Sequence, residues 1–158
     1  MAVDMFLKLA GIKGESLDHK HKDEIEVLSF SFGISQTHAA GGGGAAGKVQ
    51  FQDFRIVKNL DTASPDFFDF TCSGRHIQNG VFTVGRSHGG KDTIDYYKIS
   101  FEDVLISSVS PAGNMGDVPM EQVSFNFASV KVEARRQSAN GSFGPWETTS
   151  CDLAAQKE

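Results

Sequence analysis

Cysteine is scarce in this 158-residue chain, and long apolar runs are absent. Cys72 and Cys151 are too few for a disulfide framework, so we expect a protein that folds in the cytoplasm with both thiols reduced. A membrane span needs about 20 consecutive apolar residues, so no membrane insertion is predicted. Residues 1–8 have neither the charged region nor the apolar run of a signal peptide, so any export would require a route that carries folded proteins.

Basic residues are outnumbered by acidic ones, 15 to 20, which gives a net charge of −5. An acidic chain without a long Lys/Arg run argues against nucleic acid as a partner. Apolar residues make up 39% and charged residues 22%, which is typical of globular proteins. The length suits one core, so we predict a single domain over residues 1–158, with a frayed tail at 153–158.

Glycine and phenylalanine are abundant, with 17 and 13 residues. Alternation of apolar residues predicts strands at 3–9, 24–36, 48–58, 77–86, 93–108, 120–136 and 146–151. Breaks in the apolar phase predict irregularities at 51–54, 102–103 and 128–129. One helix is predicted over 61–74, with Ser64 as N-cap, Pro65 in its first turn and Gly74 as C-cap. Such a mainly β chain with one helix favours a small barrel or sandwich.

The clearest predicted strand is Glu24–Gln36, whose two faces differ in chemistry. Its large apolar residues share one face and are expected in the core: Leu28, Phe30, Phe32 and Ile34. The opposite face is small and hydroxylic, and it includes Ser29 and Ser31. The strand is followed by a glycine-rich segment, 37–47, that we expect to protrude as a loop.

Two segments approach motifs for ligand binding without completing them. Gly42–Lys48 has phosphate-loop spacing, but Val49 replaces the required Ser or Thr and a strand follows instead of a helix. His19, His21 and Glu26 approach the first metal motif of cupin barrels, although the glycine spacing is imperfect and no second motif follows. Solvated loop histidines are the simpler interpretation, and a metal-dependent cupin-like enzyme stays open as an alternative.

Nucleophilic catalysis finds no support in the sequence. There is no G-x-S-x-G motif, and Cys72 lies on the predicted helix, where we expect a small core residue. We therefore predict no catalytic residue, no metal site and no cofactor, and we expect a binding or assembly protein instead of an enzyme. A monomeric ligand-binding barrel is a further alternative.

Several segments, in order, resemble the haemolysin-coregulated protein (Hcp) family. The matching segments are Val3–Leu9, Gly11–Ser16, Glu24–Gly33, Gly47–Val49, Ala63–Pro65, Gly74, His76 and Ile106–Ser110. The resemblance covers about residues 3–135. Many members have Trp-x-Trp where this chain has Phe30-Ser31-Phe32, and many have a basic turn where it has Gly85–Gly89. The segment after Ser138 follows no pattern of the family.

The resemblance implies a β-barrel with one helix that forms a hexameric ring. In that family, rings stack into the inner tube of the bacterial type VI secretion machine, with a VgrG-type spike at the tip and a contractile sheath around it. The lumen holds small effector proteins, and export needs no signal peptide. The resemblance therefore implies that Ser29 and Ser31 line the lumen and contact effectors.

The glycine-rich segment is then expected to be an arm, Gln36–Lys48, that touches the next subunit or ring. A glycine run follows a neighbouring surface closely because it has no side chains to clash. The predicted contact residues are Gln36, Thr37, His38, Gly41, Gly42, Gly43, Gly44 and Lys48.

Overall fold

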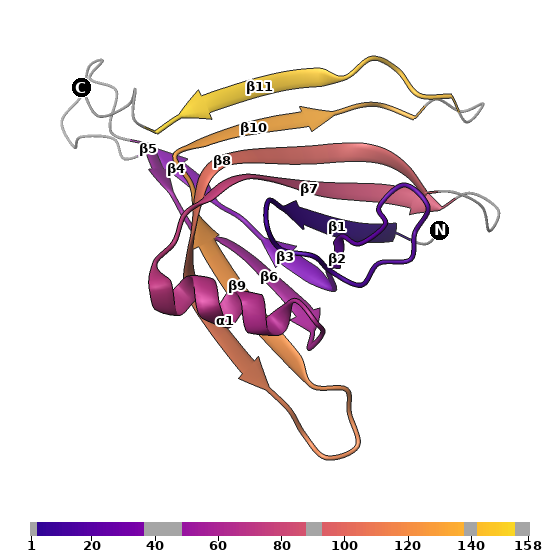
Figure 1. The fold of residues 1–158 in the computed structure, drawn as a ribbon. Coiled ribbons are helices and arrows are strands. Elements are labelled where there is room, and N and C mark those ends of the chain that lie inside the picture. Colours follow the sequence, from indigo (N-terminus) through magenta and orange to yellow (C-terminus); the bar gives the residue numbers. More distant parts are fainter. Residues whose placement is uncertain (1–2, 37–48, 88–92, 138–141, 154–158) are drawn as a thin grey trace.

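The computed structural model describes residues 3–36, 49–87, 93–137 and 142–153, and this part forms eleven strands and one helix (Figure 1). The strands are β1 Val3–Leu9, β2 Ile25–Glu26, β3 Ser29–Ser31, β4 Ile34–Gln36, β5 Val49–Phe51, β6 Phe54–Asn59, β7 Ile77–Ser87, β8 Thr93–Ala112, β9 Met120–Asn126, β10 Ser129–Ala134 and β11 Glu147–Asp152; the helix is α1 Ser64–Ser73. The predicted mainly β class with one helix is confirmed. No helix among the described residues is long and apolar enough to cross a membrane.

Most strands join one antiparallel sheet in the order β2-β1-β7-β8-β9-β6-β3. β10 pairs with β8 and β11 pairs with β10, while β4 and β5 form a separate two-stranded sheet. The long strand β8 pairs with β7 and β10 in its first half and with β9 in its second half. The change of partner falls at Asp103, whose φ is 54°. The irregularity predicted at 102–103 is therefore a corner in a continuous strand.

The sheet rolls up but does not close into the expected barrel within the described residues. Its two ends, β2 and β3, are neighbouring pieces of one segment. The backbone N–H of Val27 donates to the carbonyl of Met5 in β1 (3.0 Å), and the next N–H, of Leu28, donates to Val57 in β6 (2.8 Å). One short segment thus contacts both ends of the rolled sheet.

This bridging breaks the predicted strand Glu24–Gln36 into β2, β3 and β4. Because consecutive residues serve different sheet ends, the simple alternation of faces is lost, and Val27 is buried although alternation puts it on the same face as Ser29 and Ser31. The expectation that all four large apolar residues lie in the core is wrong for Leu28 and Ile34, which are 48% and 59% exposed. Phe30 is 39% exposed, yet its ring lies 4.6 Å from that of Phe82.

Phenylalanine side chains fill the centre of the rolled sheet. The ring of Phe54 is fully buried, and its centroid lies 5.0–5.2 Å from those of Phe82, Phe101 and Phe125. Helix α1 lies against the sheet and buries Phe67 and Phe70 (Figure 1). Tilted and edge-on ring pairs at these distances add to the stabilisation from apolar burial. The high phenylalanine content thus reflects one aromatic core.

The structure confirms the predicted C-cap of α1 and corrects its predicted N-cap. The N-cap is Ala63, which offers no side-chain cap, and Ser64 lies inside the helix. The Ser64 hydroxyl instead donates to Glu121 (2.7 Å) and accepts from the N–H of Asp61 (3.0 Å). Gly74 ends the helix with a φ of 64°, as predicted, and its N–H donates to Phe70. The left-handed conformation explains the glycine.

Two other predicted strands are each split in two. The prediction of one bulged strand over 48–58 is wrong, because β5 pairs with β4 while β6 lies in the main sheet. The strand predicted over 120–136 is interrupted after Asn126, close to the expected irregularity, and becomes β9 and β10. In both cases the change of apolar phase marks a change of pairing partner.

Candidate functional site

The predicted lumen residues, Ser29 and Ser31, both lie in β3 and are exposed. Across the sheet, Ser31 is opposite Arg55 of β6, which is opposite Ser124 of β9. Ser124 is in turn opposite Ser108 of β8. Because directly paired residues share a face of a sheet, these four side chains form one row.

A second row runs parallel to the first. Ser29 is opposite Val57, then Gln122 and then Ser110. The two rows together make a small polar surface, which we call the hydroxyl face. It consists of Ser29, Ser31, Arg55, Val57, Ser108, Ser110 and Gln122, together with Ser124, which is itself buried. The sequence showed only its first strand, because the other serines belong to strands whose register it does not reveal.

Hydrogen bonds among side chains hold part of this surface in place. The hydroxyls of Ser108 and Ser124 are bonded to each other, and Ser107 donates to Asp53 (2.5 Å). Arg55 is exposed and has no ion-pair partner within the part of the chain that the structure describes. Arg55 is therefore the one cation among the residues that define the hydroxyl face, and the Asp53 carboxylate lies at the border of that face beside Ser107.

Of the predicted contact arm, only Gln36 falls within the described residues. It ends β4, is exposed, and pairs with Val49 of β5. The others lie outside the described residues: Thr37, His38, Gly41, Gly42, Gly43, Gly44 and Lys48. Gln36 thus belongs to the separate two-stranded sheet of β4 and β5.

The candidate metal residues His19, His21 and Glu26 do not form a site. His19 and Glu26 are exposed, whereas His21 is buried and stacks on Phe6, with ring centroids 4.5 Å apart. The expectation of a solvated loop is therefore wrong for His21. Its Nδ1 contacts Glu24 and its Nε2 contacts Asp95, each at 2.9 Å. Both ring nitrogens are engaged by carboxylates.

These carboxylates change the ionisation of His21. Burial lowers its pKa, but the hydrogen bonds that its ring donates to Asp95 and Glu24, together with the negative charges of these carboxylates, outweigh that effect and raise the pKa to about 9. His21 is therefore a cation at neutral pH. It fixes the segment before β2 to β8, which is a structural role that the sequence pattern did not indicate.

A buried ion cluster surrounds Lys58, and it was not predicted from the sequence. Lys58 is 0% exposed, and its Nζ contacts Glu121 (2.5 Å) and Asp61 (2.8 Å). The cluster joins β6, β9 and the start of α1. The sequence pattern could have indicated that Lys58 is buried, because this residue lies on the same face of the predicted strand as the buried Phe54 and Ile56.

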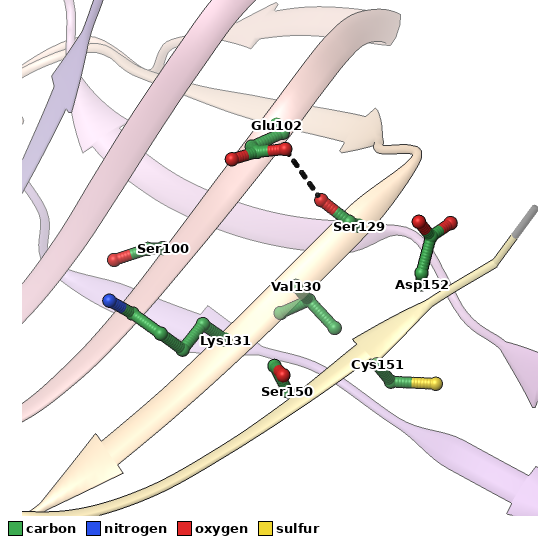
Figure 2. Close-up of a pocket in the computed structure, with 8 residues that line it drawn as sticks. All are labelled: Ser100, Glu102, Ser129, Val130, Lys131, Ser150, Cys151 and Asp152. Carbon is green, nitrogen blue, oxygen red and sulfur yellow. Dashed lines mark hydrogen bonds between the residues drawn. The ribbon is translucent and has the colours of Figure 1, made fainter.

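A shallow pocket lies on a different part of the sheet, over β8, β10 and β11 (Figure 2). It is lined by Ser100, Glu102, Ser129, Val130, Lys131, Ser150, Cys151 and Asp152. Cys151 is half-buried and packs against the core, while Cys72 is exposed on α1, so the core position predicted for Cys72 is wrong. The mixed charges of this pocket do not form a recognisable catalytic set.

Comparison with known proteins identifies the family. The family described as "Type VI secretion system effector, Hcp" matches residues 6–133. Protein hcp1 of Pseudomonas aeruginosa is 42% identical over 144 residues, which are 89% of this chain and 88% of that protein. The chain belongs to the Hcp family. It is a tube or effector protein of the type VI secretion system, and members of this family are secreted.

Solved structures agree with this membership. Hcp1 from Salmonella typhimurium is 33% identical, with a TM-score of 0.81 over 99% of both chains. A structure described as that of a type six secretion system protein is 30% identical, with a TM-score of 0.90 over 99% of both chains. The Hcp fold therefore includes the segment after residue 133, which the family match leaves out.

Proposed function

We propose that this chain is the tube subunit of a type VI secretion system, with the whole of residues 1–158 acting as one domain in a hexameric ring. Membership of the Hcp family over most of the chain is the observation that carries this proposal. The exposed edges of its sheets favour assembly, because unpaired strand edges promote association. A heterologous contact that closes on itself gives a ring.

The hydroxyl face is proposed to line the lumen and contact effectors through Ser29 and Ser31. Small hydroxyl groups and one exposed cation, Arg55, make a wettable surface without large apolar patches. Such a surface suits the passage of varied cargo because it offers weak, exchangeable hydrogen bonds. Stacked rings would carry small effectors, with a VgrG-type spike and a contractile sheath as further partners.

The proposed role is structural and needs no cofactor. Synthesis in the cytoplasm, followed by export through the type VI system, completes the proposal. The cupin-like alternative loses its support because both nitrogens of His21 bind carboxylates. A monomeric ligand-binding barrel is disfavoured by the open sheet and its phenylalanine-filled interior.

The ring is tested by size-exclusion chromatography with light scattering. We expect the mass of a hexamer at micromolar concentration, whereas a particle of 17.1 kDa, one subunit, would contradict the proposal. The lumen assignment is tested by Ser31→Gln, which adds bulk to the proposed bore without touching the core. We expect an intact hexamer with impaired effector loading.

Ser73→Gln, at the exposed end of α1, is the matched control because it makes the same change away from the hydroxyl face. It should load effectors normally. Normal loading of every effector by the Ser31→Gln ring would remove the lumen assignment but leave the ring proposal intact.

A further inference from the structure

Cations and aromatic rings are interleaved at one end of the sheet, where β7 ends, β8 begins and β10 leads to β11 (Figure 1). Each of these cations lies over at least one ring, between 4.4 and 4.8 Å from the ring centroid, and all the side chains are half-buried. We call this group the cation–aromatic cluster, and it consists of Arg86, Tyr96, Lys98, Arg135, Phe143 and Trp146. Contacts of this kind hold the charged groups in fixed positions.

Arg135 is the centre of the cluster. Its guanidinium carbon lies 4.6 Å from the ring centroid of Phe143 and 4.5 Å from that of Trp146. Its Nε donates to the carbonyl of Asp95 at 2.8 Å. An arginine that lies against rings keeps its N–H groups for hydrogen bonds in its own plane. Its two terminal nitrogens contact no acceptor within the described residues, and their fork matches the two oxygens of a carboxylate.

The cluster is a positive region on an acidic protein, whose net charge is −5. Arg86, Lys98 and Arg135 form no ion pair within residues 3–36, 49–87, 93–137 and 142–153. Glu133 stands directly opposite Lys98, but its carboxylate is paired with Lys131 at 3.3 Å. Cations that lie close together repel one another, and a bound anionic group relieves that repulsion. The cluster therefore calls for an acidic partner.

The surroundings favour an acidic protein segment over a nucleic acid. Lys98 and Glu102 lie on the same face of β8, and that face becomes acidic at the pocket of Figure 2, which Glu102 and Asp152 line. A row of phosphates that continued beyond the cluster would meet these carboxylates, whereas a short acidic segment fits within the positive end. Proteins that bind single-stranded nucleic acids stack bases on their aromatic rings, but here the rings already contact cations.

We infer that the cation–aromatic cluster is a docking site for an acidic segment of another protein, in which the fork of Arg135 binds one carboxylate while Lys98 and Arg86 face further ones. Hydrogen bonds between charged groups are about twice as strong as those between neutral groups. Arginine, tryptophan and tyrosine are also the residues that most often dominate the binding energy of protein interfaces. The inference stands apart from the proposed ring, because the cluster lies within one subunit.

The cluster contains its own probe. Trp146 is the single tryptophan of the chain, so its fluorescence reports directly on binding at this place. The ligand to be tested is a short peptide of alternating Asp and Glu, and a peptide of the same length made of Asn and Gln is its neutral control. We expect a saturable fluorescence change with the acidic peptide, weaker binding as salt is raised, and no change with the neutral peptide.

Substitutions separate the fork from the charge. Arg135→Gln should weaken binding of the acidic peptide about tenfold. Arg135→Lys keeps the charge but loses the fork, and it should bind nearly as weakly. Arg136→Gln is the matched control, because it removes the same charge from the exposed next residue, which is outside the cluster; it should bind like wild type. Lys98→Gln, with the same expected direction, serves if circular dichroism shows that Arg135→Gln does not fold.

Several outcomes would overturn the docking site. The first is a wild-type protein that gives no saturable response to the acidic peptide. Tighter binding of a single-stranded thymidine oligonucleotide than of the acidic peptide would make the cluster a nucleic-acid site. Equal weakening by Arg136→Gln and Arg135→Gln would reduce the effect to net charge.

Light scattering separates this inference from the proposed ring. Loss of the hexamer in a folded Arg135→Gln would assign the cluster to a contact between copies of the chain and overturn the docking site. A wild-type monomer that still binds the acidic peptide through Arg135 would overturn the ring and support the docking site.

Discussion

Lys58 and His21 are two buried cations that fix the fold through different environments. Lys58 sits among Glu121, Asp61 and the ring of Phe67, whose centroid lies 5.5 Å from its Nζ. His21 sits between two carboxylates at the edge of the core. A buried charge whose partner is removed is costly, so each residue predicts a measurable change in stability.

Lys58→Ala should lower the free energy of unfolding by about 3–5 kcal/mol, the range for breaking a buried ion pair. The reason is that Glu121, with a side chain only 1% exposed, would lose its nearest cation. Urea unfolding at pH 7 and constant protein concentration measures the change. Concentration must be held fixed because assembly adds to apparent stability.

The double variant Lys58→Met with Glu121→Leu is the control for this pair. It removes the charges of Lys58 and Glu121 and keeps apolar volume, while Asp61, whose side chain is 11% exposed, keeps access to water, so it should recover most of the loss. A double variant as unstable as Lys58→Ala would show that packing around Lys58, and not its charge, carries the effect.

His21 predicts a specific pH dependence of stability. Its pKa rises from 6.5 to about 9 on folding, so its stabilising contribution is complete below pH 6.5 and disappears as the pH rises through 9. The free energy of unfolding of wild type, minus that of His21→Gln, should therefore shrink between pH 6.5 and 9. Urea titrations at four or five pH values measure it.

Subtracting the variant removes the contributions of His19 and His76, which both proteins share. The groups facing His21 are the carboxylates of Glu24 and Asp95, and the variant keeps both of them. A difference that is constant from pH 6.5 to 9 would contradict the raised pKa.

At the scale of elements, the alternation of apolar residues predicted where the strands lie better than it predicted their pairing partners and buried faces. It placed β1, β7 and β11 within a residue or two, since each keeps one pairing register or one buried face. It failed over Glu24–Gln36, because consecutive hydrogen bonds from Val27 and Leu28 go to opposite ends of the sheet. Changes of partner depend on tertiary pairing, which a single sequence does not contain.

The hairpin of β4 and β5 carries the glycine-rich segment that we predict to be an assembly arm. Deletion of Gly41–Gly44 shortens this arm without removing a residue of either strand. We expect weaker ring stacking and a loss of secretion through the type VI system. Light scattering and a secretion assay measure the two effects. Normal assembly together with normal secretion would deny the arm any role in assembly.

At the scale of the whole molecule, the resemblance predicted the family and the local pattern predicted the candidate serines. The opening residues of the chain were specific enough to indicate Hcp, and the family match confirms it. The hydroxyl face could be predicted only in part, because Ser31 joins Arg55, Ser124 and Ser108 through strand register. Local sequence gave no sign that an arginine stands among these hydroxyls.

That arginine leads to a prediction about the assembled ring. If the hydroxyl face lines the lumen, each subunit contributes one Arg55, and the copies form a belt of positive charge around the bore. Such a belt would attract acidic cargo and repel basic cargo, since like charges brought together across an interface are strongly unfavourable. Arg55→Glu should reverse this preference and leave the hexamer intact, because the side chain is exposed.

Loading of a matched pair of acidic and basic cargo peptides into purified rings measures the effect. We expect acidic loading to fall about tenfold in Arg55→Glu, which corresponds to about 1.4 kcal/mol, and Arg55→Lys to load like wild type. The difference should shrink as salt is raised, because the screening length is about 10 Å at 0.1 M ionic strength. Equal loading of both peptides by wild type and Arg55→Glu would place Arg55 outside the cargo path.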